Sequence, residues 1–158
     1  MIKLGSIVTD TPTGLTGMAT LLQIEMDGSR ALHLQPRGLN PETGKPVDGF
    51  WVVESRLKGG DIVDEPDLPL DLLGTEVEDL ASGYKGTAIS IMLHLSGCVH
   101  VNVQAKGSLS KTGEAIHTAN FDIRRLKGKA IKTMSEKEKE QDKKDKPSPM
   151  DVAPRTRG

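Results

Sequence analysis

Hydrophobic and polar residues alternate along short stretches of this chain, with the period expected of strands that bury one face. The clearest alternation lies in 87–95 and 99–104, and weaker versions lie in 6–9, 18–26, 31–35, 50–53, 75–78 and 117–123. Glycine recurs between these stretches too often for helices of normal length. The pattern therefore predicts an all-β fold built from short strands joined by tight turns.

The sequence also contains an internal repeat: residues of its first part recur 69 positions later, in an alignment without gaps. Leu4-Gly5 recurs as Leu73-Gly74, and Arg-Leu-Lys-Gly at 56–59 recurs at 125–128. Further identical pairs are Val8/Val77, Asp10/Asp79, Gly14/Gly83, Gly17/Gly86, Ala19/Ala88, Gly28/Gly97, Gln35/Gln104, Gly38/Gly107, Thr43/Thr112 and Gly44/Gly113. We expect two tandem units at 1–58 and 71–128, an acidic linker at 59–70, and a charged flexible tail at 129–158.

Each unit is expected to contain a central hairpin whose register follows from its apolar residues. A three-residue loop at 95–97 places Gly97 at the left-handed position of the turn, where glycine is preferred. The register it predicts pairs Leu93 with Val99, Ile91 with Val101 and Ile89 with Val103. A loop at 26–28 predicts the same register in the first unit, pairing Ile24 with Arg30, Leu22 with Leu32 and Thr20 with Leu34. A slip of one residue would turn every side chain to the wrong face.

A unit of this length with four or five short strands is typical of a small, strongly curved SH3-like β-barrel. We therefore expect two tandem SH3-like barrels. Units this small lie near the lower size limit for independent folding. Packing of the units on each other or on neighbours in an oligomer would add stability, and the sequence leaves both arrangements open.

Composition narrows the class of protein further. The four aromatic residues are Phe50, Trp51, Tyr84 and Phe121. No apolar run approaches the roughly 18 residues of a membrane helix, and no apolar stretch typical of a signal peptide follows Lys3. The single cysteine, Cys98, excludes an internal disulfide and favours a reducing, cytoplasmic compartment.

Charge is distributed unevenly. Residues 1–126 carry 11 Lys/Arg and 16 Asp/Glu, a balance of -5, whereas residues 127–158 carry 10 and 6, a balance of +4. The acidic body disfavours nucleic-acid binding by the two units. The tail lacks the apolar residues that would offset its ordering entropy, so we expect either a solvated segment or an arm that orders on a partner.

The first unit resembles a family of small uncharacterised proteins encoded mainly by tailed bacteriophages and prophages. The residues that carry the resemblance are Lys3-Leu4-Gly5, Val8, Asp10, Thr13-Gly14, Gly17, Ala19, Gly28 and Trp51-x-x-Glu54-x-Arg56-Leu57. The second unit is less similar, with Asn120 and Ile123 in place of Trp51 and Glu54, although Gly97-Cys98 keeps the family's glycine-cysteine pair. The resemblance implies a bacteriophage setting, in the host-cell cytoplasm or the virion, and no particular activity.

One candidate metal site lies on the second hairpin. The predicted register places His94 opposite Cys98 with His100 diagonal to both, so three ligands for a soft metal ion would share one face. The alternative is an exposed polar face with an incidental thiol, because this spacing is no known metal motif. No cofactor is expected.

Candidate binding residues gather around the aromatic side chains and the glycine turns. Trp51 could form part of a peptide groove as in SH3 recognition, and either Trp51 or its neighbour Phe50 must point outward. Glu54 and Arg56 could form a surface ion pair. Tyr84 and Lys85 lie in the second of two Gly-x-x-Gly stretches, 14–17 and 83–86, which could approach a phosphate but are more typical of turns.

No catalytic motif is present, so we expect a protein that is not an enzyme. The leading hypothesis is a bacteriophage interaction protein whose barrels mediate protein–protein assembly, as a virion component or a host-directed accessory protein. A second hypothesis is a small-molecule binder that sequesters a nucleotide signal of host defence. A third is nucleic-acid binding through the tail.

Overall fold

A computed structural model describes residues 1–107, 111–113 and 118–129. The expected tail, apart from Lys129, lies outside the described residues. The described residues form ten β-strands and three 3-10 turns, without an α-helix among them. This confirms the all-β prediction.

The two units have the same strand order. In the first, β1 (Ile7–Asp10), β2 (Thr16–Glu25), β3 (Arg30–Gln35), β4 (Phe50–Val53) and β5 (Leu57–Lys58) pair in the order β5-β1-β2-β3-β4, with the turn η1 (Glu54–Arg56) before β5. In the second, the turn η2 (Leu70–Leu72) leads into β6 (Glu76–Asp79), β7 (Lys85–His94), β8 (Val99–Gln104), β9 (Ala119–Asp122), η3 (Ile123–Arg125) and β10 (Leu126–Gly128). These pair in the order β10-β6-β7-β8-β9. The repeat in the sequence is therefore a repeat in the topology.

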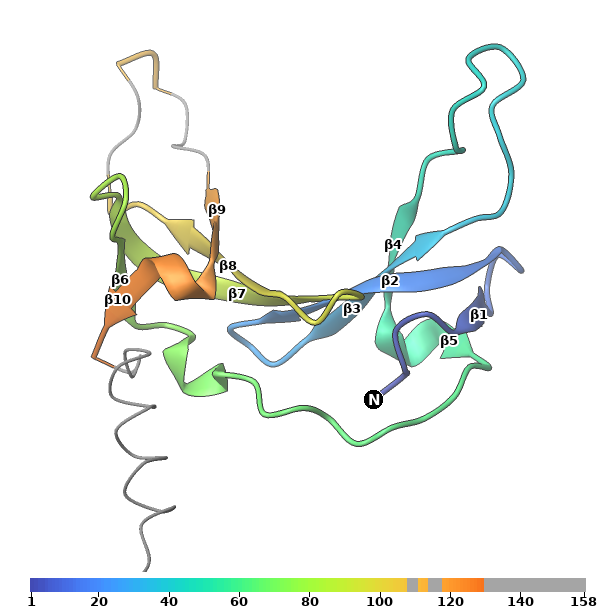
Figure 1. The fold of residues 1–158 in the computed structure, drawn as a ribbon, viewed down its shortest axis with the longest axis horizontal. Helices are drawn as coiled ribbons and strands as arrows, with labels where there is room; N and C mark the ends of the chain where they lie inside the picture. Colours follow the sequence, from blue (N-terminus) through green and yellow to red (C-terminus); the bar gives the residue numbers. More distant parts are fainter. Residues whose placement is uncertain (108–110, 114–117, 130–158) are drawn as a thin grey trace, which may run out of the picture.

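Strands β2 and β7 pair with each other and join the two units into one antiparallel sheet (Figure 1). The register runs from Leu21 opposite His94 to Glu25 opposite Ser90, with Gln23 opposite Met92 at its centre. Gln23 and Met92 occupy equivalent positions of the two units, so the pairing has the symmetry of a two-fold axis. The sheet is open, and the expected pair of separate closed barrels is not found. The physical reason is that one edge of β2 pairs with β1 only at Thr16–Met18, which leaves that edge free for β7 farther along the strand.

The hydrophobic core is continuous between the units. One cluster contains Leu22, Ile24, Leu32 and Leu34 from the first unit together with Leu93 from the second. The second cluster is built around Leu72, Val77, Ile91, Val101, Val103 and Phe121. Leu73 and Val99 pack against both clusters. Residues of the second unit therefore complete the core of the first.

The predicted hairpin register is confirmed near both turns and wrong at the far ends. Leu93 pairs with Val99 and Ile91 with Val101, and the first unit shows Ile24–Arg30 and Leu22–Leu32. Gly28 and Gly97 adopt left-handed φ angles of 83° and 89°, as the three-residue loops require. Leu34 pairs with Ala19 instead of Thr20, however, and Val103 with Ala88 instead of Ile89.

A β-bulge at the same position of each unit causes this difference. The extra residue, Thr20 or Ile89, shifts the register by one and places a fully buried alanine, Ala19 or Ala88, toward the core. Both units carry the bulge directly after this alanine. Strand alternation alone gives no sign of it.

A buried aspartate is held by arginine in each unit. Asp10 accepts hydrogen bonds from Nε and Nη2 of Arg56 at 2.9 and 2.6 Å, and Asp79 accepts the equivalent bonds from Arg125 at 2.9 and 2.7 Å. A hydroxyl, that of Thr13 or Ser82, donates to the same carboxylate. Burial would otherwise penalise each carboxylate, and the two-pronged arginine contact offsets that penalty. These pairs connect η1 to β1 and η3 to β6.

We expect the units to stay associated when the linker is cut, because Leu93 completes the first core and β2 pairs with β7. A protease site introduced next to Asp64, an exposed linker residue, allows the test. After cleavage the two fragments should co-elute in gel filtration under native conditions. If the cut chain also carries the Ile24→Asp substitution, the two fragments should separate or unfold. Separation of the fragments without that substitution would contradict a shared core.

We expect stability to fall in acid because of the two buried aspartates. Arg56 and Arg125 hold the pKa values of Asp10 and Asp79 below their usual range. The stabilisation is therefore fully present above the unfolded pKa of about 4 and is lost as the pH falls toward the folded pKa. Urea midpoints should fall most steeply below about pH 4, where these two carboxylates become protonated.

The Asp79→Asn variant should lower the midpoint at pH 7 and show a smaller acid drop, since it removes one of the two buried carboxyls whose pKa values are lowered. Asp64→Asn, at an exposed position of the linker, is the matched control and should follow the parent protein. An acid profile of Asp79→Asn as steep as that of the parent would refute this assignment.

Candidate functional site

The face of the sheet opposite the core is formed by both units, and we call it the inter-unit face. Three rows of side chains cross it, as the strand register defines. The first runs from β4 to the β7–β8 turn, the second from β4 to β9, and the third from the β2–β3 turn to β9. The rows are Trp51, His33, Leu21, His94 and Cys98; Val53, Ala31, Gln23, Met92, His100 and Asp122; and Ser29, Glu25, Ser90, Asn102 and Asn120. Strands β4 and β9 lie at opposite ends of this face, in the first and the second unit respectively (Figure 1).

The two halves of this face differ chemically although the units repeat. The eight equivalent pairs on the face are Trp51/Asn120, His33/Asn102, Leu21/Ser90, Glu25/His94, Ser29/Cys98, Val53/Asp122, Ala31/His100 and Gln23/Met92, and every pair differs. Core pairs such as Leu22/Ile91, Leu34/Val103 and Leu57/Leu126 all remain apolar. Packing constrains the core pairs in both units, whereas the face has lost its two-fold symmetry.

The half contributed by the first unit is aromatic. The rings of Trp51 and His33 meet edge to face, with centroids 5.2 Å apart and an interplanar angle of 66°. Thr20 at the bulge contacts Nδ1 of His33 at 2.9 Å and fixes the imidazole. The Trp51 side chain is 46% exposed, while Phe50 packs against the core. The prediction that one of the two aromatic neighbours points outward is thereby confirmed, and that residue is Trp51.

The half contributed by the second unit carries a network of carboxamides. Asn120 donates to Oδ1 of Asn102 at 2.8 Å, and Asn102 donates to the hydroxyl of buried Ser90 at 2.8 Å. His100 is bound to Oδ1 of Asn120 through Nδ1 at 2.7 Å. Both amides also contact the sulfur of Met92. The network presents amide groups in fixed orientations on a half-buried surface.

The pairing of β2 with β7 is called the seam between the units. His94 stands next to this seam, opposite Leu21. Its ring centroid lies 4.4 Å from that of His100, and its Nε2 is buried with no hydrogen-bond partner among the described residues. Burial, and secondarily the neighbouring His100, lowers the pKa of His94 below its ordinary value. His94 is therefore neutral at pH 7.

The candidate three-ligand metal site is not assembled, in keeping with the alternative of a polar face with an incidental thiol. The two imidazoles come together, but within the described parts of the chain no three His, Cys, Asp or Glu side chains are grouped so as to hold a metal ion. Cys98 is exposed beside the turn, whereas the His94 ring packs against that of His100. The register placed the three residues on one face, and side-chain packing separated the thiol from the pair.

The other predicted binding residues do not form one site. The expected Glu54–Arg56 ion pair is wrong, because Glu54 binds Nε of Arg30 at 2.6 Å and Arg56 binds Asp10. The 3-10 turn over 54–56 replaces the extended strand that the expected pair required. In the second unit, Tyr84 packs on Phe121 with centroids 5.5 Å apart, and Lys85 lies 3.5 Å from Glu78.

Each of the two Gly-x-x-Gly stretches begins beside a tight turn and ends within a strand, with Gly17 in β2 and Gly86 in β7. Gly14 and Gly83 adopt left-handed φ angles of 72° and 76° at the ends of these turns. At Gly86 a Cβ atom would lie 2.2 Å from the carbonyl oxygen of Gln104, so only glycine permits this approach of β7 to β8. Both observations explain the glycines through backbone geometry.

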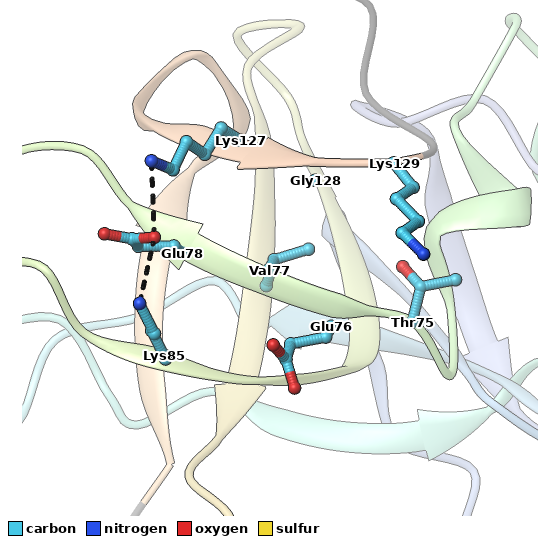
Figure 2. Close-up of a pocket in the computed structure, with 8 residues that line it drawn as sticks. All are labelled: Thr75, Glu76, Val77, Glu78, Lys85, Lys127, Gly128 and Lys129. Carbon is cyan, nitrogen blue, oxygen red and sulfur yellow. Dashed lines mark ion pairs between the residues drawn. The ribbon is translucent and has the colours of Figure 1, made fainter.

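A hollow on the outer side of the second unit is lined by charged residues of β6, β7 and β10 (Figure 2). Glu78 lies between Lys85 and Lys127, at 3.5 and 3.4 Å from their ammonium groups, and Glu76 binds Lys106 at 2.5 Å. These lysines already have carboxylate partners. The hollow ends at Lys129, next to residues outside the described range, and the inter-unit face is therefore the better defined candidate.

Sequence reasoning identified Trp51, His94, Cys98 and His100 on this face and missed the remainder. The missed residues include His33, Ser90, Met92, Asn102 and Asn120, and their shared signal is that each differs from its counterpart 69 positions away. The seam could not be predicted, because the alternation pattern identifies a strand's faces and leaves the partner at its edge open.

We expect an NMR titration of the imidazoles to give a midpoint for His94 below 6.5, since burial opposes its protonation. Because the folded pKa is lowered, acidification below about pH 6.5 favours the unfolded chain. In the His100→Gln variant the midpoint of His94 should rise, because one neighbouring positive charge is removed. An unchanged midpoint would mean that burial alone sets the value.

In the described residues no helix is long and apolar enough to cross a membrane. Comparisons of the chain with protein-family models, with curated proteins and with solved structures found no match.

Proposed function

We propose that this chain is a non-enzymatic interaction protein that binds a protein partner on the inter-unit face. We further propose that each unit is an SH3-like barrel left open by the seam, an idea supported by the order β5-β1-β2-β3-β4 and its repetition in the second unit. The setting suggested by the resemblance of the first unit is a bacteriophage, with the protein acting in the host cytoplasm or the virion.

The observation that carries this proposal is the exposed Trp51 within a continuous face built by both units. A tryptophan that is 46% exposed leaves a large apolar surface in water, and tryptophan is enriched in protein interfaces. The surrounding His33, Leu21 and Met92 are half-buried and provide a mixed apolar and polar surface. Such a mixture is typical of non-obligate protein interfaces.

Charge supports a protein partner over a phosphate-rich one. The positions of the inter-unit face carry no Lys or Arg, and the adjacent Arg124 is bound by Asp122 at 2.8 Å. Binding of nucleic acid or of a nucleotide would draw on cationic side chains to neutralise phosphates. The body of the chain has a net balance of -5 outside its last 32 residues.

Site-specific photocrosslinking in the cells that naturally produce the protein tests this proposal. A benzophenone amino acid at Val53 or at Asn120 places the probe in either half of the face, and one at Ile62, which is 73% exposed in the linker, is the control. Protein adducts of one defined mass should form from both face positions and not from Ile62. Absence of adducts from the face, or equal adducts from Ile62, would overturn the proposal.

A further inference from the structure

We propose that the inter-unit face binds one extended, uncharged peptide segment of the partner in a single orientation. An apolar or proline-containing part of the segment packs on Trp51 and His33, and its peptide groups bind the carboxamides of Asn102 and Asn120. This inference rests on the proposed function, and it specifies the chemistry of the partner segment and the orientation in which that segment binds.

The broken symmetry carries the directional part of the argument. A symmetric pair of units would offer two equivalent half-sites, and an extended ligand could lie across them in either direction. Here Trp51 and His33 stand where the second unit has Asn120 and Asn102. A segment with unlike ends therefore gains different contacts in its two orientations, and one orientation is preferred.

The dimensions of the face fit a short extended segment. Trp51 and Asn120 lie on the first and last of six adjacent strands, β4-β3-β2-β7-β8-β9, and are offset by four residues along the strands. Five strand spacings of about 4.8 Å and an offset of about 14 Å give roughly 28 Å on a flat sheet, which matches about eight extended residues. A segment of this length reaches both halves, while a shorter one reaches only one of them.

Each half of the inter-unit face favours a different part of the peptide segment. The rings of Trp51 and His33, which meet edge to face, form a surface on which an apolar or proline side chain can pack. The N–H groups of both carboxamides are directed to Ser90, Met92 or Asn102, and each amide oxygen has one partner within the network. The second lone pair of each oxygen can therefore accept a hydrogen bond from a peptide N–H of the segment. The Asn102–Asn120–His100 contacts orient these amides before binding, which reduces the entropy that binding must overcome.

The centre of the face favours a peptide over a polyhydroxylated chain. Leu21 and Met92 lie between the aromatic and amide halves, and an apolar side chain of a peptide can cover them. Sugar hydroxyls placed there would lose water without gaining a hydrogen bond. The absence of Lys and Arg from the face positions favours a segment without acidic residues, and Glu25 is already bound by Gln23.

Selection from a random dodecapeptide library against the full chain provides the probe. The selected peptide, synthesised alone, should bind with one-to-one stoichiometry and change the fluorescence of Trp51, the single tryptophan. Calorimetry should show affinity losses of about tenfold or more for Trp51→Ala and about threefold to tenfold for Asn120→Ala. Leu15→Ala, at an apolar residue 52% exposed in a turn of the first unit, is the matched control and should stay within about twofold.

Spin labels at the two ends of the peptide test the orientation. A nitroxide at one end should broaden NMR signals of the first unit only, and a nitroxide at the other end those of the second unit only. Broadening of both units from each end, two peptides per chain, or affinities unchanged by both face variants would overturn the inference. Selection of no peptide, with a neutral oligosaccharide such as maltoheptaose quenching Trp51 instead, would also overturn it.

Photocrosslinking separates this failure from failure of the proposed function. Defined protein adducts from Val53 and Asn120, combined with a negative peptide selection, would retain a protein partner and reject the extended segment. Absence of adducts from both positions would reject the protein partner itself.

Discussion

The pairing of β2 with β7 is the interaction on which the rest of the molecule depends. Five residue pairs join the units there, and the symmetry of their register places equivalent residues, Gln23 and Met92, opposite each other. The pairing satisfies backbone groups that would otherwise form an exposed sheet edge, a common site of unwanted association. It also carries Leu93 into the core of the first unit, so that two units near the lower size limit share one apolar interior.

The buried aspartate in each unit has a local role that complements the seam. Asp10 and Asp79 hold Arg56 and Arg125, and through them the 3-10 turns that lead from β4 to β5 and from β9 to β10. The contact works only with both partners present, because a buried carboxylate without its arginine is costly. Its recurrence at both positions explains why aspartate and arginine survive in the repeat while polar residues on the inter-unit face diverge.

Divergence within one chain separates structural residues from candidates for function. Equivalent positions that stay apolar, such as Leu22 and Ile91, are held by packing on both sides of the seam. Equivalent positions that change, such as Trp51 and Asn120, lie where packing imposes little constraint. A fused repeat can in this way turn a symmetric surface into one with two different ends, which an arrangement of two identical chains could not do.

The sequence by itself determined the all-β class, the two units and the pairing near each hairpin turn. These features depend on local rules. Alternation of apolar and polar residues indicates strands, glycine permits left-handed turns, and the internal repeat shows each of these patterns a second time. Only the tertiary structure decided the bulges at Thr20 and Ile89, the arginine partners of Asp10 and Asp79, and the seam that opens the expected barrels into one sheet. The physical reason is that each of these depends on which distant segment meets a strand edge or a buried charge. Alternation records only which face of a strand is apolar, and two edges of the same strand look identical in the sequence.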